Sequence, residues 1–245
     1  MMYLETPPRL IETRVFSTMP AAFRRKGVAT SWADANRPGQ DTDSFIEGPS
    51  FDAEGHLYVV DIPFGRIFRI APSGEWSLAI AYEGWPNGLK IAADGRILVA
   101  DYKHGLMELD AKAGRMQPLL TARNSESFRG CNDLHLAANG DIYFTDRGQT
   151  GLQDPPGRAY RLSPNGRLDC LIDTGISPNG LALDSRETVL FVAHASLGHV
   201  FVFAPNGELI ARIKSPARMS RSAARPATVS ILRSRHGTGR EHQCS

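Results

Sequence analysis

The chain has 245 residues, of which 42% are hydrophobic and 22% charged, as expected for a globular protein that could form one large all-β domain. The formal net charge is +2, but residues 216–245 alone carry +5, which leaves −3 for residues 1–215. This mildly acidic main part argues against a nucleic-acid partner, and no apolar stretch of about 18 residues indicates a membrane span. The three cysteines are widely spaced and no signal sequence is evident, so we expect a cytoplasmic protein.

The first part of the chain, residues 1–46, shows little regular patterning. We expect one strand in it, Leu10–Phe16. If the rest of the chain forms a ring of sheets, this strand would complete the last sheet and close the ring.

A strand–turn–strand unit then occurs four times, and this repeat is the strongest signal in the sequence. The copies start at Gly48, Gly88, Asp133 and Gly180, so they are separated by 40, 45 and 47 residues. The first three contain a Glu-Gly, Asp-Gly or Asn-Gly turn and end in Asp, whereas the fourth ends in His194. Two more strands follow each copy: Arg66–Ile70 and Trp76–Tyr82, Leu106–Asp110 and Met116–Thr121, Arg158–Leu162 and Leu168–Asp173, and His199–Phe203 and Leu209–Ile213.

Four short strands in every 40 to 50 residues are typical of a β-propeller blade. A fold of alternating strands and helices would need helical periodicity over about 10 residues or more between strands, and the sequence has none. We therefore predict three regions: an N-terminal segment (1–46), propeller blades (47–215), and a basic tail (216–245). The tail has six Arg and five Ser where a fifth repeat should start. It is predicted to be disordered, or else an aberrant ending such as a shifted reading frame produces.

Oxygen-bearing residues stand at the head of the first strand in every copy. In a four-stranded meander, this head and the loop after the second strand lie on the same side of the ring. The heads carry Glu47, Asn87, Asn132 with Asp133, and Asn179, and the loops begin at Asp61, Asp101, Asp146 and His194. One carboxylate and several amide oxygens suit a hard divalent cation such as calcium or magnesium. Two alternatives stay open: the Asn residues before Gly are turn residues, and the Asp residues cap loops.

Two long loops of the third copy, Ala122–Cys131 and Asp146–Pro156, lie on the same side as these heads. They are predicted to form a lid, with Arg129 as a cationic contact for a substrate; the alternative is that they are tolerated insertions. His104 and His194 are weaker candidates for a proton carrier, because neither has a carboxylate next to it in sequence.

The segments EGPSFDAEGHLYVVD, PNGLKIAADGRILVAD, CNDLHLAANGDIYFTDRGQTGLQDPPGRAYRL and SPNGLALDSRETVLFVA resemble the SMP-30/gluconolactonase/LRE-like family. The resemblance covers roughly residues 45–215 and implies an all-β propeller of the six-bladed type, with about four blades recognisable and the later blades missing. It implies that Glu47, Asn132 and Asn179 hold the metal, that Asn132 also contacts substrate, and that Arg129 approximates a substrate-binding Arg.

The implied function is metal-dependent hydrolysis of a sugar-type or other small lactone. The cofactor would be one divalent ion, calcium first, with zinc, magnesium or manganese as alternatives. A metal-binding Asp that the family supplies from a later blade, often proposed as general base, has no counterpart after residue 215. The catalytic residue is therefore unassigned, and we expect weak or absent activity. The alternatives are a non-catalytic propeller fragment that binds a metal or partner, and a propeller enzyme acting on esters or another substrate. The sequence does not set the oligomeric state.

Overall fold

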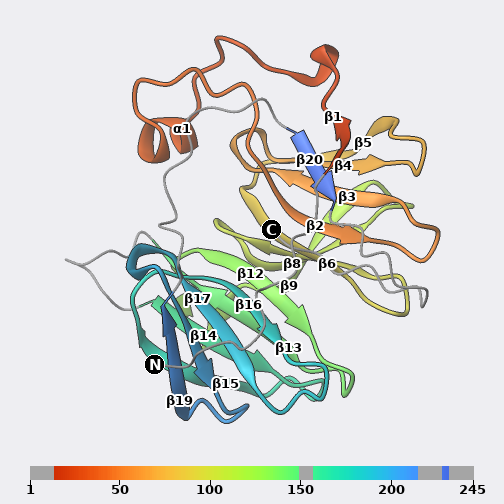
Figure 1. Ribbon diagram of the computed structural model, residues 1–245. Coiled ribbons are helices and arrows are strands. Elements are labelled where there is room, and N and C mark those ends of the chain that lie inside the picture. Colours follow the sequence, from red (N-terminus) through yellow and green to blue (C-terminus); the bar gives the residue numbers. More distant parts are fainter. Residues whose placement is uncertain (1–13, 149–156, 215–227, 232–245) are drawn as a thin grey trace, which may run out of the picture.

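Four antiparallel sheets of four strands each make up most of the chain (Figure 1). The computed structural model describes residues 14–148, 157–214 and 228–231. Each sheet is a meander in which every strand pairs with the next one along the chain. This arrangement confirms the predicted all-β propeller with four blades.

The blades are numbered in chain order, and their strands have the following bounds. Blade 1 consists of β2 (Ile46–Phe51), β3 (Leu57–Asp61), β4 (Arg66–Ile70) and β5 (Trp76–Ala81), and blade 2 of β6 (Pro86–Ile91), β7 (Ile97–Asp101), β8 (Gly105–Asp110) and β9 (Arg115–Leu120). Blade 3 consists of β12 (Cys131–Leu136), β13 (Ile142–Asp146), β14 (Gly157–Leu162) and β15 (Leu168–Gly175), and blade 4 of β16 (Pro178–Leu183), β17 (Leu190–His194), β18 (His199–Phe203) and β19 (Leu209–Lys214).

The turns between the first two strands of blades 1 to 3 follow the sequence signal closely. Gly55, Gly95 and Gly140 have φ values of 82°, 86° and 87°, in the left-handed region that glycine adopts without strain. Their N–H groups bond to the carbonyl three residues back, at 3.1, 2.9 and 3.0 Å. Local turn chemistry therefore sets these hairpins, as predicted.

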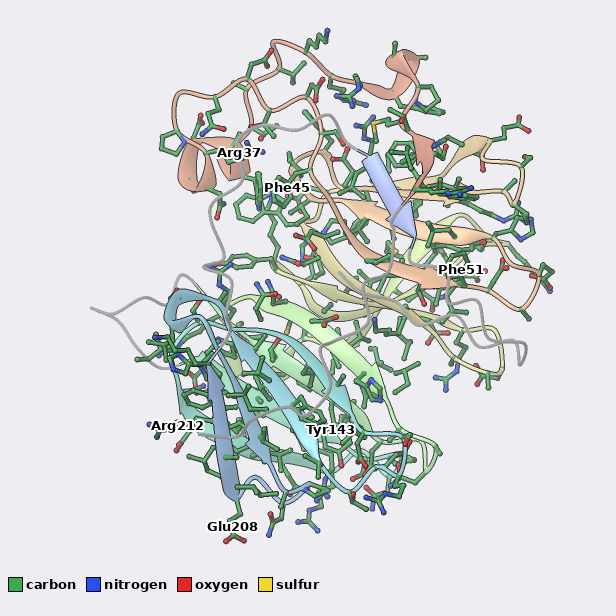
Figure 2. All side chains as sticks on the ribbon, in the orientation of Figure 1. Arg37, Phe45, Phe51, Tyr143, Glu208 and Arg212 are labelled. Carbon is green, nitrogen blue, oxygen red and sulfur yellow. The ribbon has the colours of Figure 1, made fainter. Side chains whose placement is uncertain are left out.

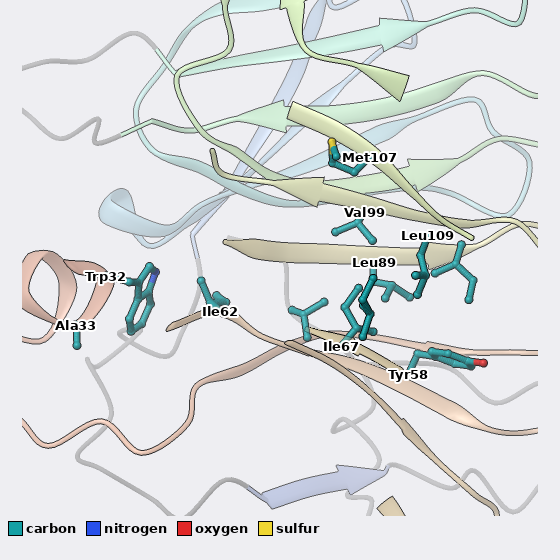
Figure 3. Packing of buried hydrophobic residues seen from close by; sticks show 12 residues of the cluster. Trp32, Ala33, Tyr58, Ile62, Ile67, Leu89, Val99, Met107 and Leu109 are labelled. Carbon is teal, nitrogen blue, oxygen red and sulfur yellow. The ribbon is translucent and has the colours of Figure 1, made fainter. Parts of the chain in front are cut away.

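Apolar side chains between neighbouring blades hold the sheets together. Figure 3 shows the cluster between blades 1 and 2, where Tyr58, Ile67, Leu89, Val99 and Met107 meet. Similar clusters lie between blades 2 and 3 and between blades 3 and 4. Burying one such side chain contributes about 1.5–3 kcal/mol. This packing brings the first strands β2, β6, β12 and β16 next to one another in that order (Figure 1).

A short helix, α1 (Ser31–Asn36), corrects the expectation that residues 1–46 are irregular. The Thr30 hydroxyl caps it by accepting a hydrogen bond from Ala33 N at 3.2 Å. Trp32 is buried and its ring lies 4.8 Å from that of Phe45, which is covered in turn by the Arg37 guanidinium at 5.6 Å (Figure 2). The helix thus anchors the chain two residues before Glu47.

Short 3₁₀ turns accompany these elements: η1 (Ala21–Phe23), η2 (Ile62–Phe64) and η3 (Ala195–Leu197). None of the helices in residues 14–148 and 157–214 is long and apolar enough to cross a membrane.

A two-stranded sheet joins the N-terminal segment to the predicted tail. Strand β1 (Arg14–Thr18) pairs antiparallel with β20 (Thr228–Ile231). It lies beside blade 1, where the Ser17 hydroxyl donates to Gly74 O and accepts from Trp76 Nε1, both at 2.8 Å. The predicted strand Leu10–Phe16 begins outside the described residues, and most of the tail lies outside them as well. The ring-closing role and the division into three regions stay predictions.

Candidate metal site at the heads of the inner strands

All four inner strands are irregular at the residues predicted as ligands. The pairing of each first strand with the second shifts register between Glu47 and Ser50, Pro86 and Gly88, Cys131 and Leu134, and Pro178 and Leu181. Such bulges bend a strand locally and redirect its side chains, and they are common beside active sites. Because Asn87 and Asn179 lie inside strands, the turn interpretation is wrong for both.

Glycine next to the candidate ligands permits a close approach of neighbouring blades. A Cβ on Gly48 would lie 2.6 Å from the carbonyl oxygen of Asn87, and one on Gly88 would lie 2.7 Å from the Cα of Asp133. Both contacts are with backbone, which cannot move aside. The glycines of the Glu47-Gly48 and Asn87-Gly88 pairs therefore allow the heads of neighbouring inner strands to pack closely.

Glu47 is a carboxylate withdrawn from water. Its pKa is raised to about 7, mainly by burial and then by the negative charge of Asp133, against the opposing effect of the Arg147 guanidinium. Within the described residues its carboxylate accepts no hydrogen bond. A carboxylate in this state is stabilised when a cation binds next to it.

Asp133 is the second carboxylate of the site, and sequence reasoning placed it at a strand head without assigning it a role. Its oxygens accept hydrogen bonds from the N–H of Leu134 at 2.9 Å and of Leu181 at 3.2 Å. Burial raises its pKa, whereas Lys90 and the two backbone bonds counteract this rise. Its position directly after Asn132 is the sequence feature that could have marked Asp133 as a site residue.

Two amide side chains, those of Asn132 and Asn179, also come from the heads of inner strands. Asn132 is only 3% exposed, and Asn179 is partly buried on the neighbouring inner strand. Neither side chain has a hydrogen-bond partner in the part of the chain that the structure describes. Their amide oxygens are therefore available to a ligand.

Arg147 is a cationic residue near Glu47 to which the sequence assigned no role, whereas Arg129 lies at the surface. The Arg129 side chain is 41% exposed, and its guanidinium lies 4.0 Å from the Glu126 carboxylate. Arg147 is partly buried, acts electrostatically on Glu47, and donates from Nε to the Ser177 hydroxyl at 2.8 Å. A substrate role for Arg129 stays a prediction.

The Asp residues that end the second strands hold the backbone, which agrees with the loop-cap interpretation. Asp61 is fully buried, accepts a hydrogen bond from Phe45 N at 2.7 Å and pairs with the Arg66 guanidinium. Asp101 accepts bonds from the Tyr82 hydroxyl at 2.6 Å and from Lys103 N at 2.8 Å. Asp146 accepts one from Gly130 N at 2.7 Å.

The two histidines considered as proton carriers each contact a backbone carbonyl, and Nε2 of His194 is buried without a hydrogen-bond partner among the described residues. His104 Nε2 lies 2.7 Å from the carbonyl oxygen of Glu83 at the surface. His194 is buried, which lowers its pKa; its Nδ1 donates to Ile176 O at 3.0 Å, and its ring stacks on Phe201.

The long loops of blade 3 are described only in part. The first contains a small hairpin of β10 (Ala122–Arg123) and β11 (Glu126–Ser127), and Phe128 anchors it on the aromatic core of the blade. Residues 149–156 of the predicted lid lie outside the described residues.

A second group of potential ligands, Asp52, Glu54 and His56, lies in the turn between β2 and β3. His56 already contacts Asp52 at 3.0 Å through Nδ1 and the Arg69 guanidinium at 2.7 Å through Nε2. Its two ring nitrogens are therefore occupied, and the positive charge of the Arg69 guanidinium would repel a cation.

Comparison with known proteins places the chain in a family. Residues 45–193 match the SMP-30/Gluconolactonase/LRE-like region. A gluconolactonase from Zymomonas mobilis is 33% identical over 173 residues, which are 61% of this chain and 48% of that protein. Lactonase drp35 from Staphylococcus aureus is 29% identical over 177 residues, which are 69% of this chain and 52% of that protein. The chain thus spans about half the length of the curated relatives it matches.

Solved structures support the fold. A gluconolactonase from Xanthomonas campestris aligns with a TM-score of 0.62 and 22% identity, covering 84% of this chain and 74% of that one. Regucalcin from Agrobacterium tumefaciens, a calcium-binding protein, aligns with a TM-score of 0.52 and 18% identity, covering 71% of this chain and 75% of that one. The repeated blades, the match over residues 45–193 and these alignments agree: the chain belongs to the SMP-30/gluconolactonase/LRE-like family.

Proposed function

We propose that the protein binds one divalent cation at Glu47, Asn132 and Asn179 and hydrolyses a small lactone. The observation that carries this proposal is the state of Glu47, a partly buried carboxylate with a raised pKa that accepts no hydrogen bond from a described residue and lies near a second carboxylate, Asp133. The gluconolactonase and lactonase relatives support the reaction class.

The residues fit a hard cation. Two carboxylates and two amide side chains supply only oxygen ligands, which calcium and magnesium prefer over nitrogen or sulfur. Calcium is our first choice because it accepts large, irregular oxygen shells, and the described site contains no cysteine or histidine ligand that would favour zinc. Magnesium, manganese and zinc are the ions to compare with it.

Each side chain has a distinct task in this proposal. When bound, a divalent cation polarises a carbonyl and makes water a better nucleophile. Glu47 and Asp133 supply the negative charge that holds it, and the amides of Asn132 and Asn179 complete the ligand set without adding charge. Arg147, whose charge acts on Glu47, can donate hydrogen bonds to an oxygen of the lactone or of the hydroxy acid formed from it.

The test is lactone hydrolysis by the purified chain with and without chelator, using gluconolactone as the first substrate. Glu47→Gln keeps the shape but removes the charge, and Glu54→Gln is the matched control because Glu54 is an exposed residue of the same blade. We expect chelator and Glu47→Gln to abolish turnover and Glu54→Gln to leave it unchanged. Hydrolysis that persists under both treatments would rule the proposal out.

The second candidate is a non-catalytic propeller that binds a metal or a partner. It is favoured by exposed apolar residues on β19, the outer strand of blade 4: Leu209 (41%), Ile210 (58%) and Ile213 (51%). Figure 2 places Glu208 and Arg212 at this same outer edge. Under this alternative the chain binds calcium and self-associates but turns over no lactone, which sedimentation together with the hydrolysis assay would reveal.

A further inference from the structure

Thr145 on β13 connects the two inner strands that carry most of the site. Its side chain is completely buried. The hydroxyl accepts a hydrogen bond from the backbone N–H of Asp133 at 3.1 Å and donates one to the backbone carbonyl of Asn179 at 2.8 Å. One hydroxyl thus holds the head of β12 against the head of β16.

This link joins two blades where no sheet pairing does so. β12 and β16 belong to different sheets, and the register of each with its own partner is interrupted at these residues. Three other described hydrogen bonds link blades 3 and 4: Leu181 N to the Asp133 carboxylate, Arg147 Nε to the Ser177 hydroxyl, and Ala138 N to the Glu187 carboxylate. Of the four, only the Thr145 hydroxyl bonds to the backbone of both Asp133 and Asn179.

The other blades do without a hydroxyl at this position. The residue before the final Asp or His of the second strand is Val60 in blade 1, Ala100 in blade 2 and Ala193 in blade 4. Val60 and Ala100 are fully buried, and both blades form complete four-stranded sheets. A threonine here is therefore not a requirement of the blade, and its hydroxyl is used only at the head of the site.

We propose that Thr145 is a positioning residue that sets the affinity of the cation site by fixing the spacing of Asn132 and Asp133 relative to Asn179. This inference rests on the proposed function, because it assumes that these residues hold a cation. Ligand oxygens must be placed within about 0.5 Å of their required positions. Residues that orient metal ligands typically change metal affinity by about 10–100-fold when they are removed.

Thr145→Val tests this directly, because valine keeps the shape of threonine without the hydroxyl. Thr145→Ser keeps the hydroxyl, and Thr145→Ala reproduces the residue of blades 2 and 4 should the valine variant fail to fold. The matched control is Ser50→Ala: Ser50 is buried, and its hydroxyl accepts a hydrogen bond from Ile91 N at 3.2 Å, also between two blades but away from the strand heads. Each variant is titrated with calcium by calorimetry, and its melting temperature is recorded.

We expect Thr145→Val and Thr145→Ala to weaken calcium binding by about tenfold or more. Thr145→Ser should bind like the unmodified chain. Ser50→Ala should lower the melting temperature, as loss of a buried hydrogen bond does, while leaving calcium affinity unchanged.

Equal affinity in the unmodified chain, Thr145→Val and Thr145→Ala would overturn the positioning role and leave the proposed cation site standing. Equal weakening by Thr145→Ser and Thr145→Val would also overturn it, because the hydroxyl would then not matter. Absence of calcium binding by the unmodified chain would overturn the cation site and this inference together.

Discussion

The charge of Asp133 on blade 3 raises the pKa of Glu47 on blade 1, although blade 2 separates the two along the chain. The pair meets because Gly88, on the inner strand between them, allows the backbone of β6 to lie against that of Asp133. Two partly buried carboxylates that act on each other in this way repel one another unless a positive charge compensates them. Under the proposed function a cation supplies this charge, at a place formed by the heads of several strands and not by a local motif.

Glu47 gives metal-free protein a defined pH dependence. Its pKa is about 7 in the folded state and near its ordinary value of 4.5 when unfolded, so between these pH values the folded state binds more protons. The free energy of unfolding should therefore fall as pH rises from about 4.5 to 7, by about 3 kcal/mol from this residue. Denaturant unfolding at a series of pH values measures the slope.

Glu47→Gln provides the control for this pH effect, because glutamine does not titrate. The variant should show a flatter stability profile across the same pH window. An identical slope in both proteins would mean that Glu47 ionises normally in the folded state.

Gly88→Ala should disrupt the site, whereas Gly180→Ala should be tolerated. Both glycines follow an Asn at a strand head, but a Cβ on Gly88 would lie 2.7 Å from Asp133 Cα, and one on Gly180 would lie 3.5 Å from an Asp133 carboxylate oxygen. We expect Gly88→Ala to lower the free energy of unfolding by about 1–3 kcal/mol, because overpacking displaces the backbone. Thermal unfolding of both variants checks this; equal melting temperatures would contradict the close approach of β6 and β12.

Substitution of Arg147 should lower kcat/KM for the lactone more than substitution of Arg129. Removing a charged hydrogen-bond donor to a substrate costs about 1.5–3 kcal/mol, or roughly 10–100-fold in kcat/KM. We expect this loss for Arg147→Gln and little change for Arg129→Gln, because Arg129 is largely exposed and lies near Glu126. Steady-state kinetics on gluconolactone make the comparison. A greater loss in Arg129→Gln would restore the sequence-based assignment.

The blades could be predicted from the sequence because each depends on local signals. Turn glycines such as Gly55 and Gly95 need a left-handed backbone, and alternating apolar residues define the strands around them. Two of the predicted strands, Arg66–Ile70 and His199–Phe203, have the bounds seen in the structure. Helix α1 was missed because six residues give too little periodicity, and its stability comes from burying Trp32.

The site could be predicted only in outline. Repeat equivalence placed Glu47, Asn132 and Asn179 at one end of the propeller, and they stand on the inner strands β2, β12 and β16, with β6 between β2 and β12. Asp133, Arg147 and Thr145 were not assigned, because their importance depends on contacts between blades that lie far apart in sequence. The Asn87-Gly88 pair was ambiguous for the same reason: the backbone of Asp133, which requires the glycine, belongs to another strand.

Calorimetric titration of chelator-treated protein with calcium, at pH 6 and pH 8, is the sharpest test of a cation site at the strand heads. We expect one bound ion, tighter binding at pH 8 because Glu47 must first lose its proton, and loss of binding in Glu47→Gln with retention in Glu54→Gln. Absence of binding in folded protein, or equal binding by Glu47→Gln, would contradict a cation site at the heads of the inner strands.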